Sequence, residues 1–199
     1  MKGFVIYTAT SSKSIEMAKN TQSMFTDIDV SLFKGVDKTN VWQTFVDSNF
    51  SILDITQVIG YVDGLLGNFY SHYNLWLKCI ELNESILVLE HDAITNYQID
   101  FDVLKNFKGD LLNLGEPHWG THVFNGDGVT KRKKGEHECL IGVHSYLVNP
   151  SGAKKLIDGT EKGILPADNY IRQELIDIYD YLPHPIKQSG TLSLTQVHE

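Results

Sequence analysis

The sequence predicts a single α/β domain, with a mostly parallel central sheet flanked by helices. Short apolar segments alternate along the chain with segments of helical periodicity, which is the pattern of a three-layer α/β domain. The length of 199 residues fits one domain, over residues 1–199. Hydrophobic residues make up 42% of the chain and charged residues 21%, ordinary values for a globular protein.

The first elements of this pattern are two strands joined by a helix. Residues 3–8 are short and apolar, as in a buried strand. The hydroxyl residues at 10–12 supply N-cap candidates for a helix. Residues 29–33 predict a second strand, ended by a turn through Gly35 and Asp37.

The middle of the chain contains the longest predicted helix and a buried strand. Residues 65–81 form an amphipathic helix, because apolar side chains recur at helical spacing: Leu66, Phe69, Tyr73, Trp76, Leu77 and Ile80. Residues 85–89 predict a fully buried strand, and residues 110–114 predict another. Residues 115–138 are rich in Gly, His and charge without periodicity, which predicts a long mobile loop.

The last third predicts one strand and two helices. Residues 142–148 are strand-like, and Asn149 and Pro150 then start a helix. Residues 168–179 predict a further helix, and residues 183–199 a C-terminal tail. In such a sheet, ligands bind at the carboxyl ends of the strands.

The charge balance excludes one class of partner. With 25 acidic and 17 basic residues, the chain lacks the basic footprint of a protein that binds duplex nucleic acid. The basic run at residues 131–134 is either a solvated loop, which we favour, or a clamp for an anionic acceptor. Arg132 and Arg172 are candidate phosphate ligands or ion-pair partners.

The cysteines and the apolar runs indicate the cell compartment. Cys79 and Cys139 have no metal-type spacing, and we interpret both as reduced. The longest strictly aliphatic run, at residues 86–89, is far too short to span a bilayer. We therefore expect a cytoplasmic protein without a transmembrane segment.

The strongest site candidate is the acidic triplet Glu90-His91-Asp92, which ends the predicted strand at residues 85–89. Two carboxylates two residues apart at a strand end converge on one point. Such oxygen ligands suit Mg²⁺ or Mn²⁺, especially where phosphate oxygens complete the octahedron. The alternative is a solvated turn, in which Asp and Glu are common.

Several segments, in order, resemble glycosyltransferase family 25, the group of lipooligosaccharide and collagen galactosyltransferases. Residues 64–72 resemble the family's Gly-x-x-Gly-x-x-x-Ser-His, followed by a Trp-containing helix, and residues 86–92 resemble its aliphatic strand ending in Glu-Asp-Asp. Residues 142–147 are similar to Gly-Thr-His-Ala-Tyr-Leu, residues 166–168 to Pro-Val-Asp, and residues 185–189 with Ser193 to the closing Gln and Ser segment. The departures are Leu65 for Glu, Asn68 for Cys, His91 for the middle Asp and Lys13 for an early Arg.

The resemblance implies a GT-A-like fold and a metal-dependent, inverting transfer. A hexose, galactose or glucose, would pass from a UDP-sugar to a hydroxyl of a glycan acceptor, with Mn²⁺ or Mg²⁺ as cofactor. An acceptor from lipopolysaccharide biosynthesis would bring the enzyme to the inner membrane surface. Two alternatives remain: a non-catalytic relative that binds sugar nucleotides or glycans, inactivated at His91, and the same chemistry on a hydroxylated nucleic-acid base.

The resemblance also implies roles for individual residues. Asp92 would be the first metal ligand, Glu90 the next and His91 a further candidate. Asp168 would be the general base, although it could equally be a helix N-cap. The candidates for binding the nucleotide sugar are Thr8, Lys13, Asp37 and His72.

A last group of residues is assigned to the acceptor or to secondary roles. His144 and His72 are each either buried core histidines or site residues. Trp119 and His118 could stack on an acceptor sugar or anchor the long loop. Gln188 matches the family's closing segment, and His184 and His198 are candidates for an additional metal-binding histidine near the C-terminus.

Overall fold

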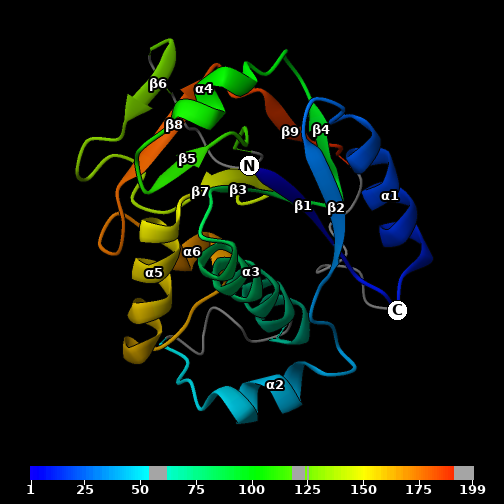
Figure 1. Cartoon of the computed structure of the whole chain (residues 1–199). Coiled ribbons are helices and arrows are strands. Elements are labelled where there is room, and N and C mark those ends of the chain that lie inside the picture. Colours follow the sequence, from blue (N-terminus) through cyan, green and yellow to red (C-terminus); the bar gives the residue numbers. More distant parts are fainter. Residues whose placement is uncertain (54–61, 118–123, 125, 191–199) are drawn as a thin grey trace.

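The computed structural model describes residues 1–53, 62–117, 124 and 126–190. The chain is α/β, with helices on both faces of a central sheet (Figure 1). In chain order the elements are β1 (Lys2–Tyr7), α1 (Ser12–Ser23), β2 (Asp29–Lys34), α2 (Val41–Ser48), α3 (Val62–Leu82), β3 (Ile86–Glu90), β4 (Ala93–Thr95), α4 (Phe101–Asn106), β5 (Leu111–Asn113), β6 (Gly128–Lys131), β7 (Ser145–Val148), α5 (Pro150–Gly159), the 3₁₀ turn η2 (Thr160–Lys162), α6 (Ala167–Tyr170), β8 (Ile178–Leu182) and β9 (Ile186–Gln188).

The central sheet has the strand order β2-β1-β3-β7-β5-β8-β6. Strands β2, β1, β3, β5 and β8 run in one direction, and β7 and β6 run against them, so the predicted, mostly parallel sheet is confirmed. In the register, Ile6 lies opposite Glu90 and Tyr7 opposite Lys34. The carboxyl ends of β1, β2 and β3 therefore share one edge. The short strands β4 and β9 pair separately.

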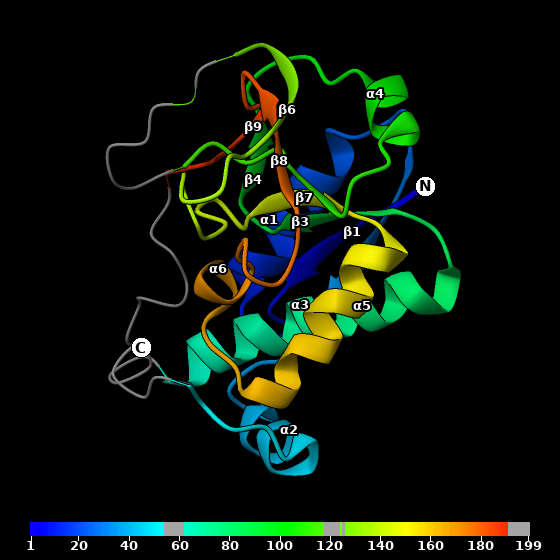
Figure 2. The same ribbon diagram turned by 90° about the vertical axis from the view of Figure 1, so that its left-hand side faces the viewer.

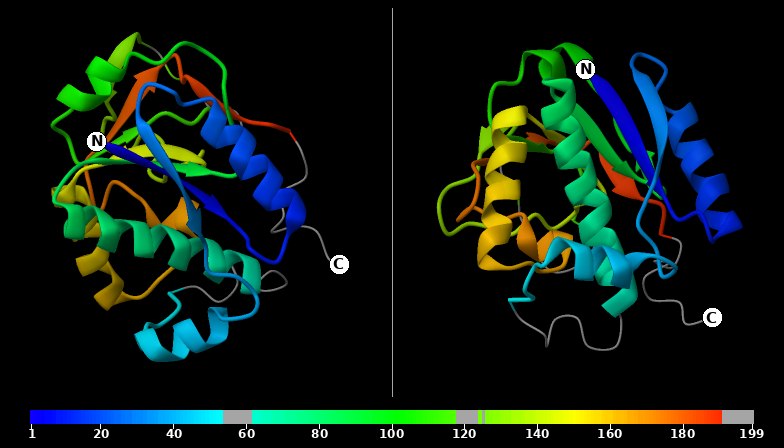
Figure 3. Two further views of the ribbon diagram at one scale, coloured as in Figure 1. Left: turned by 45° about the vertical axis from the view of Figure 1, so that its right-hand side comes forward. Right: turned by 60° about the horizontal axis from the view of Figure 1, so that its bottom comes forward.

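Alternate residues of the strands point to opposite faces of the sheet and belong to two hydrophobic cores. Phe4, Val88 and Tyr146 belong to the core that the sheet shares with α3, α5 and α6. Val5 and Leu87 face the opposite core, together with α1 and α4. Figures 2 and 3 show this division, with α3 and α5 crossing one face and α1 against the other. This alternation is what the period of a strand buried on both faces requires.

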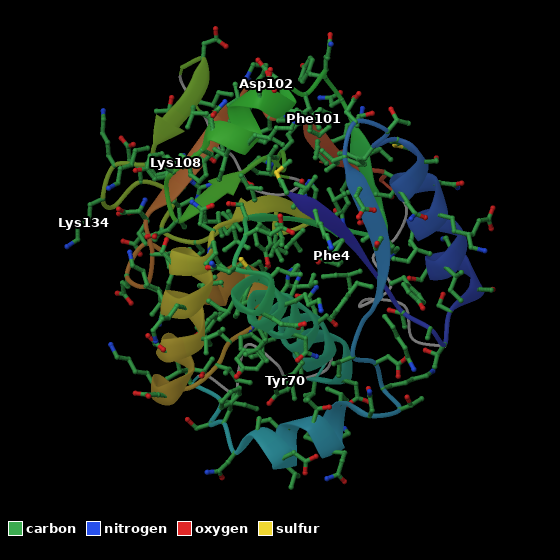
Figure 4. All side chains as sticks on the ribbon, viewed as in Figure 1. Phe4, Tyr70, Phe101, Asp102, Lys108 and Lys134 are labelled. Atoms are coloured by element: carbon green, nitrogen blue, oxygen red, sulfur yellow. The ribbon has the colours of Figure 1, made fainter. Side chains whose placement is uncertain are left out.

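Helix α3 is the element that connects this sheet to α2. Trp76 and Phe69 are fully buried against the sheet side, as the apolar spacing predicts, while Leu77 and Ile80 are exposed. Tyr70 points from α3 toward α2 (Figure 4), where its hydroxyl lies 2.7 Å from Ser48 Oγ. The N-terminal half of α3 thus lies near the carboxyl ends of the strands, beside the acidic triplet.

The predicted helix at residues 168–179 is wrong. Helix α6 ends at Tyr170, and residues 178–182 form β8. The reason is a two-residue period, in which Ile178, Asp180 and Leu182 are buried while Tyr179 and Tyr181 are partly exposed. Residues with aromatic and β-branched side chains in this pattern favour a strand.

The predicted loop and tail also contain strands. Strand β6 lies within residues 115–138 and pairs with β8 at the sheet edge. Strand β9 lies within the predicted tail and pairs with β4. Both cysteines are free, as expected. Among the described helices, none has the length and apolar character that crossing a membrane requires.

Candidate active site

Glu90 ends β3 and is held by two side chains of α3. Its Oε1 accepts a hydrogen bond from Asn68 Nδ2 at 2.7 Å and lies 3.3 Å from His72 Nε2. Its backbone N–H donates to the carbonyl of His144 at 2.8 Å. Asn68 and His72 are four residues apart and so lie on one face of the helix. Asn68, one of the residues that differ from the family pattern, therefore contacts the candidate site directly.

A second layer of buried groups lies behind this carboxylate. His72 Nδ1 is 2.9 Å from the hydroxyl of Tyr146, which also accepts a 2.9 Å hydrogen bond from Trp76 Nε1. Burial alone would raise the pKa of Glu90, but the hydrogen bond from His72, together with the electrostatic influence of the neighbouring histidines, lowers it. Glu90 is therefore a carboxylate anion at neutral pH.

Asp92 lies in the turn between β3 and β4 and is only 3% exposed. Gln188 hydrogen-bonds its side chain, and the backbone N–H of Ser189 donates to its carbonyl at 2.9 Å. Among the described residues, Asp92 Oδ1 is buried and has no hydrogen-bond partner. Burial and the negative charge of Glu90 raise the pKa of Asp92. A buried carboxylate oxygen in this state calls for a cation or a donor that the described part of the chain does not supply.

The turn that carries the triplet is fixed through its main chain. Thr21 Oγ1, from α1, lies 2.8 Å from the carbonyl of His91 and 2.9 Å from that of Ala93. Gln188 follows from the pairing of β9 with β4, in which it lies opposite Ala93. The sequence-predicted residues Glu90, Asp92, His72 and Gln188 are thus brought together.

The donor set fits a Mg²⁺ or Mn²⁺ that binds together with a diphosphate. No three His, Cys, Asp or Glu side chains of the described part cluster as a complete metal site. These cations, however, are commonly held by one or two carboxylates, with water and substrate phosphates completing the shell. Asp92 Oδ1 and the anionic Glu90 provide such a pair, and a cation would relieve their mutual repulsion.

The predicted nucleotide-binding residues lie along the same sheet edge, with one exception. Thr8 follows β1, and its N–H donates to Ser14 Oγ at 2.9 Å, while Lys13 is exposed in the first turn of α1. Asp37 follows β2 and accepts hydrogen bonds from the N–H and hydroxyl of Thr39. The exception is His72: its ring is 0% exposed, which does not fit direct contact with the nucleotide sugar.

The two other candidates on the described chain have different surroundings. Asp168 is in the first turn of α6, near Cys139, and accepts the N–H of Asn169 at 3.1 Å. The N-cap of α6 is Pro166, so the cap interpretation of Asp168 is wrong. His144 is buried beside Gly115, with its carbonyl bonded to Glu90. Trp119, His118 and His198 lie outside the described residues.

Arg132 and His184 are committed to a buried network away from the triplet. Arg132 donates to both carboxylate oxygens of Asp180, at 2.6 and 2.7 Å, so of its two predicted roles the structure shows the ion-pair partner and not the phosphate ligand. His184 Nε2 lies 3.2 Å from Asp180 Oδ1 and 3.1 Å from Asn113 Nδ2. The basic run is therefore no continuous clamp, because its arginine points inward while Lys134 is exposed (Figure 4).

Comparison with known proteins gives one family. The family model described as glycosyltransferase family 25 (LPS biosynthesis protein) matches residues 3–171. No curated protein matches the chain.

Among solved structures, two of the galactosyltransferase LgtC are similar over 90% of this chain. They have 10% and 11% identity, TM-scores of 0.43 and 0.46, and 73% and 72% of their own length covered. The structure of A197 from STIV has 12% identity and a TM-score of 0.45, with 90% of this chain and 80% of that chain covered.

Proposed function

The chain belongs to glycosyltransferase family 25 and is a glycosyltransferase, and we propose that it transfers a hexose from a UDP-sugar to a hydroxyl of a glycan acceptor. The transfer is metal-dependent and inverts the anomeric configuration, and the hexose is galactose or glucose. The observation that carries the metal proposal is that Asp92 Oδ1, beside the anionic Glu90, is buried and has no hydrogen-bond partner among the residues that the structure describes. A glycan precursor in lipopolysaccharide biosynthesis would be an acceptor at the inner membrane surface.

The residues around the triplet bind and orient the donor. Asp92 and Glu90 would hold Mn²⁺ or Mg²⁺, which, when bound, neutralises the charge of the departing diphosphate. Asp37, fixed by Thr39 at the end of β2, would face the nucleoside. Hydrogen bonds from Thr39 and the charge of Lys34 lower the pKa of Asp37 despite burial, so it accepts hydrogen bonds as an anion.

The acceptor side requires a base. In an inverting transfer, the acceptor oxygen forms a bond to the anomeric carbon while the bond to the diphosphate breaks on the opposite face. The proton of the attacking hydroxyl goes to Asp168 in this proposal, because a carboxylate beside the hydroxyl is the usual base. The transition state is oxocarbenium-like, as in glycoside hydrolysis.

The experiment measures UDP affinity by calorimetry, with Mn²⁺ and with chelator. Asp92→Asn keeps the shape of the side chain but removes its charge, and we expect it to weaken Mn²⁺-dependent UDP binding by at least about 10-fold. Asp102→Asn is the matched control, since this carboxylate is 85% exposed on α4. Equal UDP affinity with Mn²⁺ and with chelator in the wild type would refute the metal proposal.

A further inference from the structure

A continuous chain of hydrogen bonds runs from the core to Glu90. Trp76 Nε1 donates to the Tyr146 hydroxyl at 2.9 Å, the hydroxyl is 2.9 Å from His72 Nδ1, and His72 Nε2 is 3.3 Å from Glu90 Oε1. Trp76, Tyr146 and His72 are each 0% exposed. Groups this deeply buried make no direct contact with a sugar or a nucleotide. The hydrogen bonds between them nevertheless end at Glu90, a candidate ligand of the metal ion.

The donors and acceptors of this chain define its direction. An indole N–H only donates, so the Tyr146 oxygen is the acceptor for Trp76. The buried hydroxyl hydrogen of Tyr146 needs an acceptor, and among the described residues the group beside it is His72 Nδ1 at 2.9 Å, so we assign Nδ1 as the acceptor nitrogen of a neutral ring. The proton of the imidazole is consequently on Nε2, where it points at the carboxylate. With the opposite tautomer, two acceptors would face each other between His72 and Glu90.

We propose that Trp76, Tyr146 and His72 are positioning residues, which hold Glu90 toward the cation through an Nε2–H tautomer of His72. The role of the cation rests on the proposed function, whereas the tautomer does not. Asn68 is the second donor to the same oxygen, Oε1, at 2.7 Å. Two donors on Oε1 fix the rotation of the carboxylate and assign Oε2 to the cation or its bound water. Groups that orient metal ligands in this way influence metal affinity without touching the metal.

Tyr146→Phe tests the proposal at a distance from the metal. It removes one hydroxyl, contacts neither Glu90 nor Asp92, and leaves His72 Nδ1 without its donor. Tyr170→Phe is the matched control: Tyr170 is also buried and packs on Trp76, but its hydroxyl donates to the carbonyl of Leu156 at 2.6 Å. Both variants lose a buried tyrosine hydroxyl, and only one interrupts the chain to Glu90.

The first readout is the affinity for Mn²⁺ alone, measured by electron paramagnetic resonance on the full chain. We expect Tyr146→Phe to raise the Kd by roughly 10-fold, the low end of the effect of such orienting groups, and Tyr170→Phe to leave it unchanged. His72→Gln, which keeps an N–H toward Glu90, is expected to retain more Mn²⁺ affinity than His72→Leu. An unchanged Kd in Tyr146→Phe would overturn the proposal, and melting temperatures separate this outcome from a loss of folding.

The second readout is independent of the metal. Side-chain ¹⁵N–¹H spectra, with the His72 signal assigned by its loss in His72→Gln, report which ring nitrogen carries the proton. An Nε2–H tautomer whose Nδ1 signal shifts in Tyr146→Phe and not in Tyr170→Phe supports the proposal, and a proton on Nδ1, in either the neutral or the charged ring, overturns it. If the wild type binds no Mn²⁺, the metal proposal fails, and these spectra alone decide whether His72 positions Glu90.

Discussion

Arg132 and Asp180 form the most deeply buried ion pair of the described residues, and its loss is expected to be costly. Their side chains are 3% and 4% exposed. The guanidinium also donates to the carbonyls of His137 and Cys139, both at 2.9 Å. Arg132→Met would leave the Asp180 carboxylate buried with Asn113 and His184 as its remaining side-chain partners among the described residues. The partly buried carbonyls of His137 and Cys139 would lose the same donor.

Removing one partner of a buried pair costs about 3–5 kcal/mol. For a chain of this size, each kcal/mol lowers the melting temperature by about 2–4 °C, so we expect a decrease of about 6–20 °C. Thermal unfolding followed by circular dichroism measures it. The control is Lys131→Met, because the neighbouring Lys131 is 51% exposed and pairs with Asp177 in solvent, where an ion pair stabilises little.

The pH dependence follows from the pKa of Asp180. Burial opposes its ionisation, but the hydrogen bonds from Arg132 and His184 hold this pKa well below its usual range. A lowered folded-state pKa contributes stability that is complete above the unfolded value of about 4 and is lost as pH falls through the folded value. The difference between wild type and Arg132→Met should therefore shrink below about pH 4.

The double variant Arg132→Met/Asp180→Leu separates lost charge pairing from lost packing. Because it leaves no unpaired charge, it is expected to recover much of the stability that Arg132→Met loses. A melting temperature of Arg132→Met equal to that of Lys131→Met would refute the reasoning. So would a double variant less stable than Arg132→Met.

Two further predictions concern turnover and backbone packing. Asp168→Asn should lower the rate of hexose transfer by about 10²- to 10⁴-fold with a near-normal melting temperature, because Pro166 rather than Asp168 occupies the N-cap; near-normal turnover would exclude Asp168 as the base. Gly67→Ala should destabilise the chain, since an added Cβ would lie 2.7 Å from the carbonyl oxygen of Val36. Helix propensity alone would give a gain of about 1 kcal/mol, so the sign of the change in a urea titration decides between the two.

The features that the sequence predicted correctly are local in the chain. The strand that ends in Glu90 is a continuous aliphatic run, and the helix at residues 65–81 has a clear period, so β3 and α3 were predictable from their own residues. Strand β8 differs from the predicted helix at residues 168–179 because its own pattern is short. Its two-residue alternation begins only at Ile178, after the short α6 and its turns.

The contacts that define the site are distant in the chain and had little local signal. His72 meets Tyr146 across 74 residues, and Arg132 meets Asp180 across 48. The composition of residues 131–134 indicates a solvated run, yet Arg132, directly after β6, donates its N–H to the carbonyl of Ile178 at 3.0 Å and has a buried side chain. In the sequence, Asn68 is notable only because it differs from the family pattern. Its partner, Glu90, is determined by the packing of α3 against β3.

The contacts that hold the turn show how much its shape depends on His91, which stands where the family has Asp. The contacts of Thr21 use the carbonyls of residues 91 and 93, while Asn68 and His72 hold Glu90, and Gln188 holds Asp92. These contacts use the main chain of residues 91 and 93 or the side chains of Glu90 and Asp92, and none uses the side chain of residue 91. The turn therefore keeps its shape whatever side chain stands at 91, and what changes is the number of carboxylates, two in place of three. The two carboxylates that remain, Glu90 and Asp92, are the pair on which the proposed metal site rests, so that proposal does not depend on the side chain at residue 91.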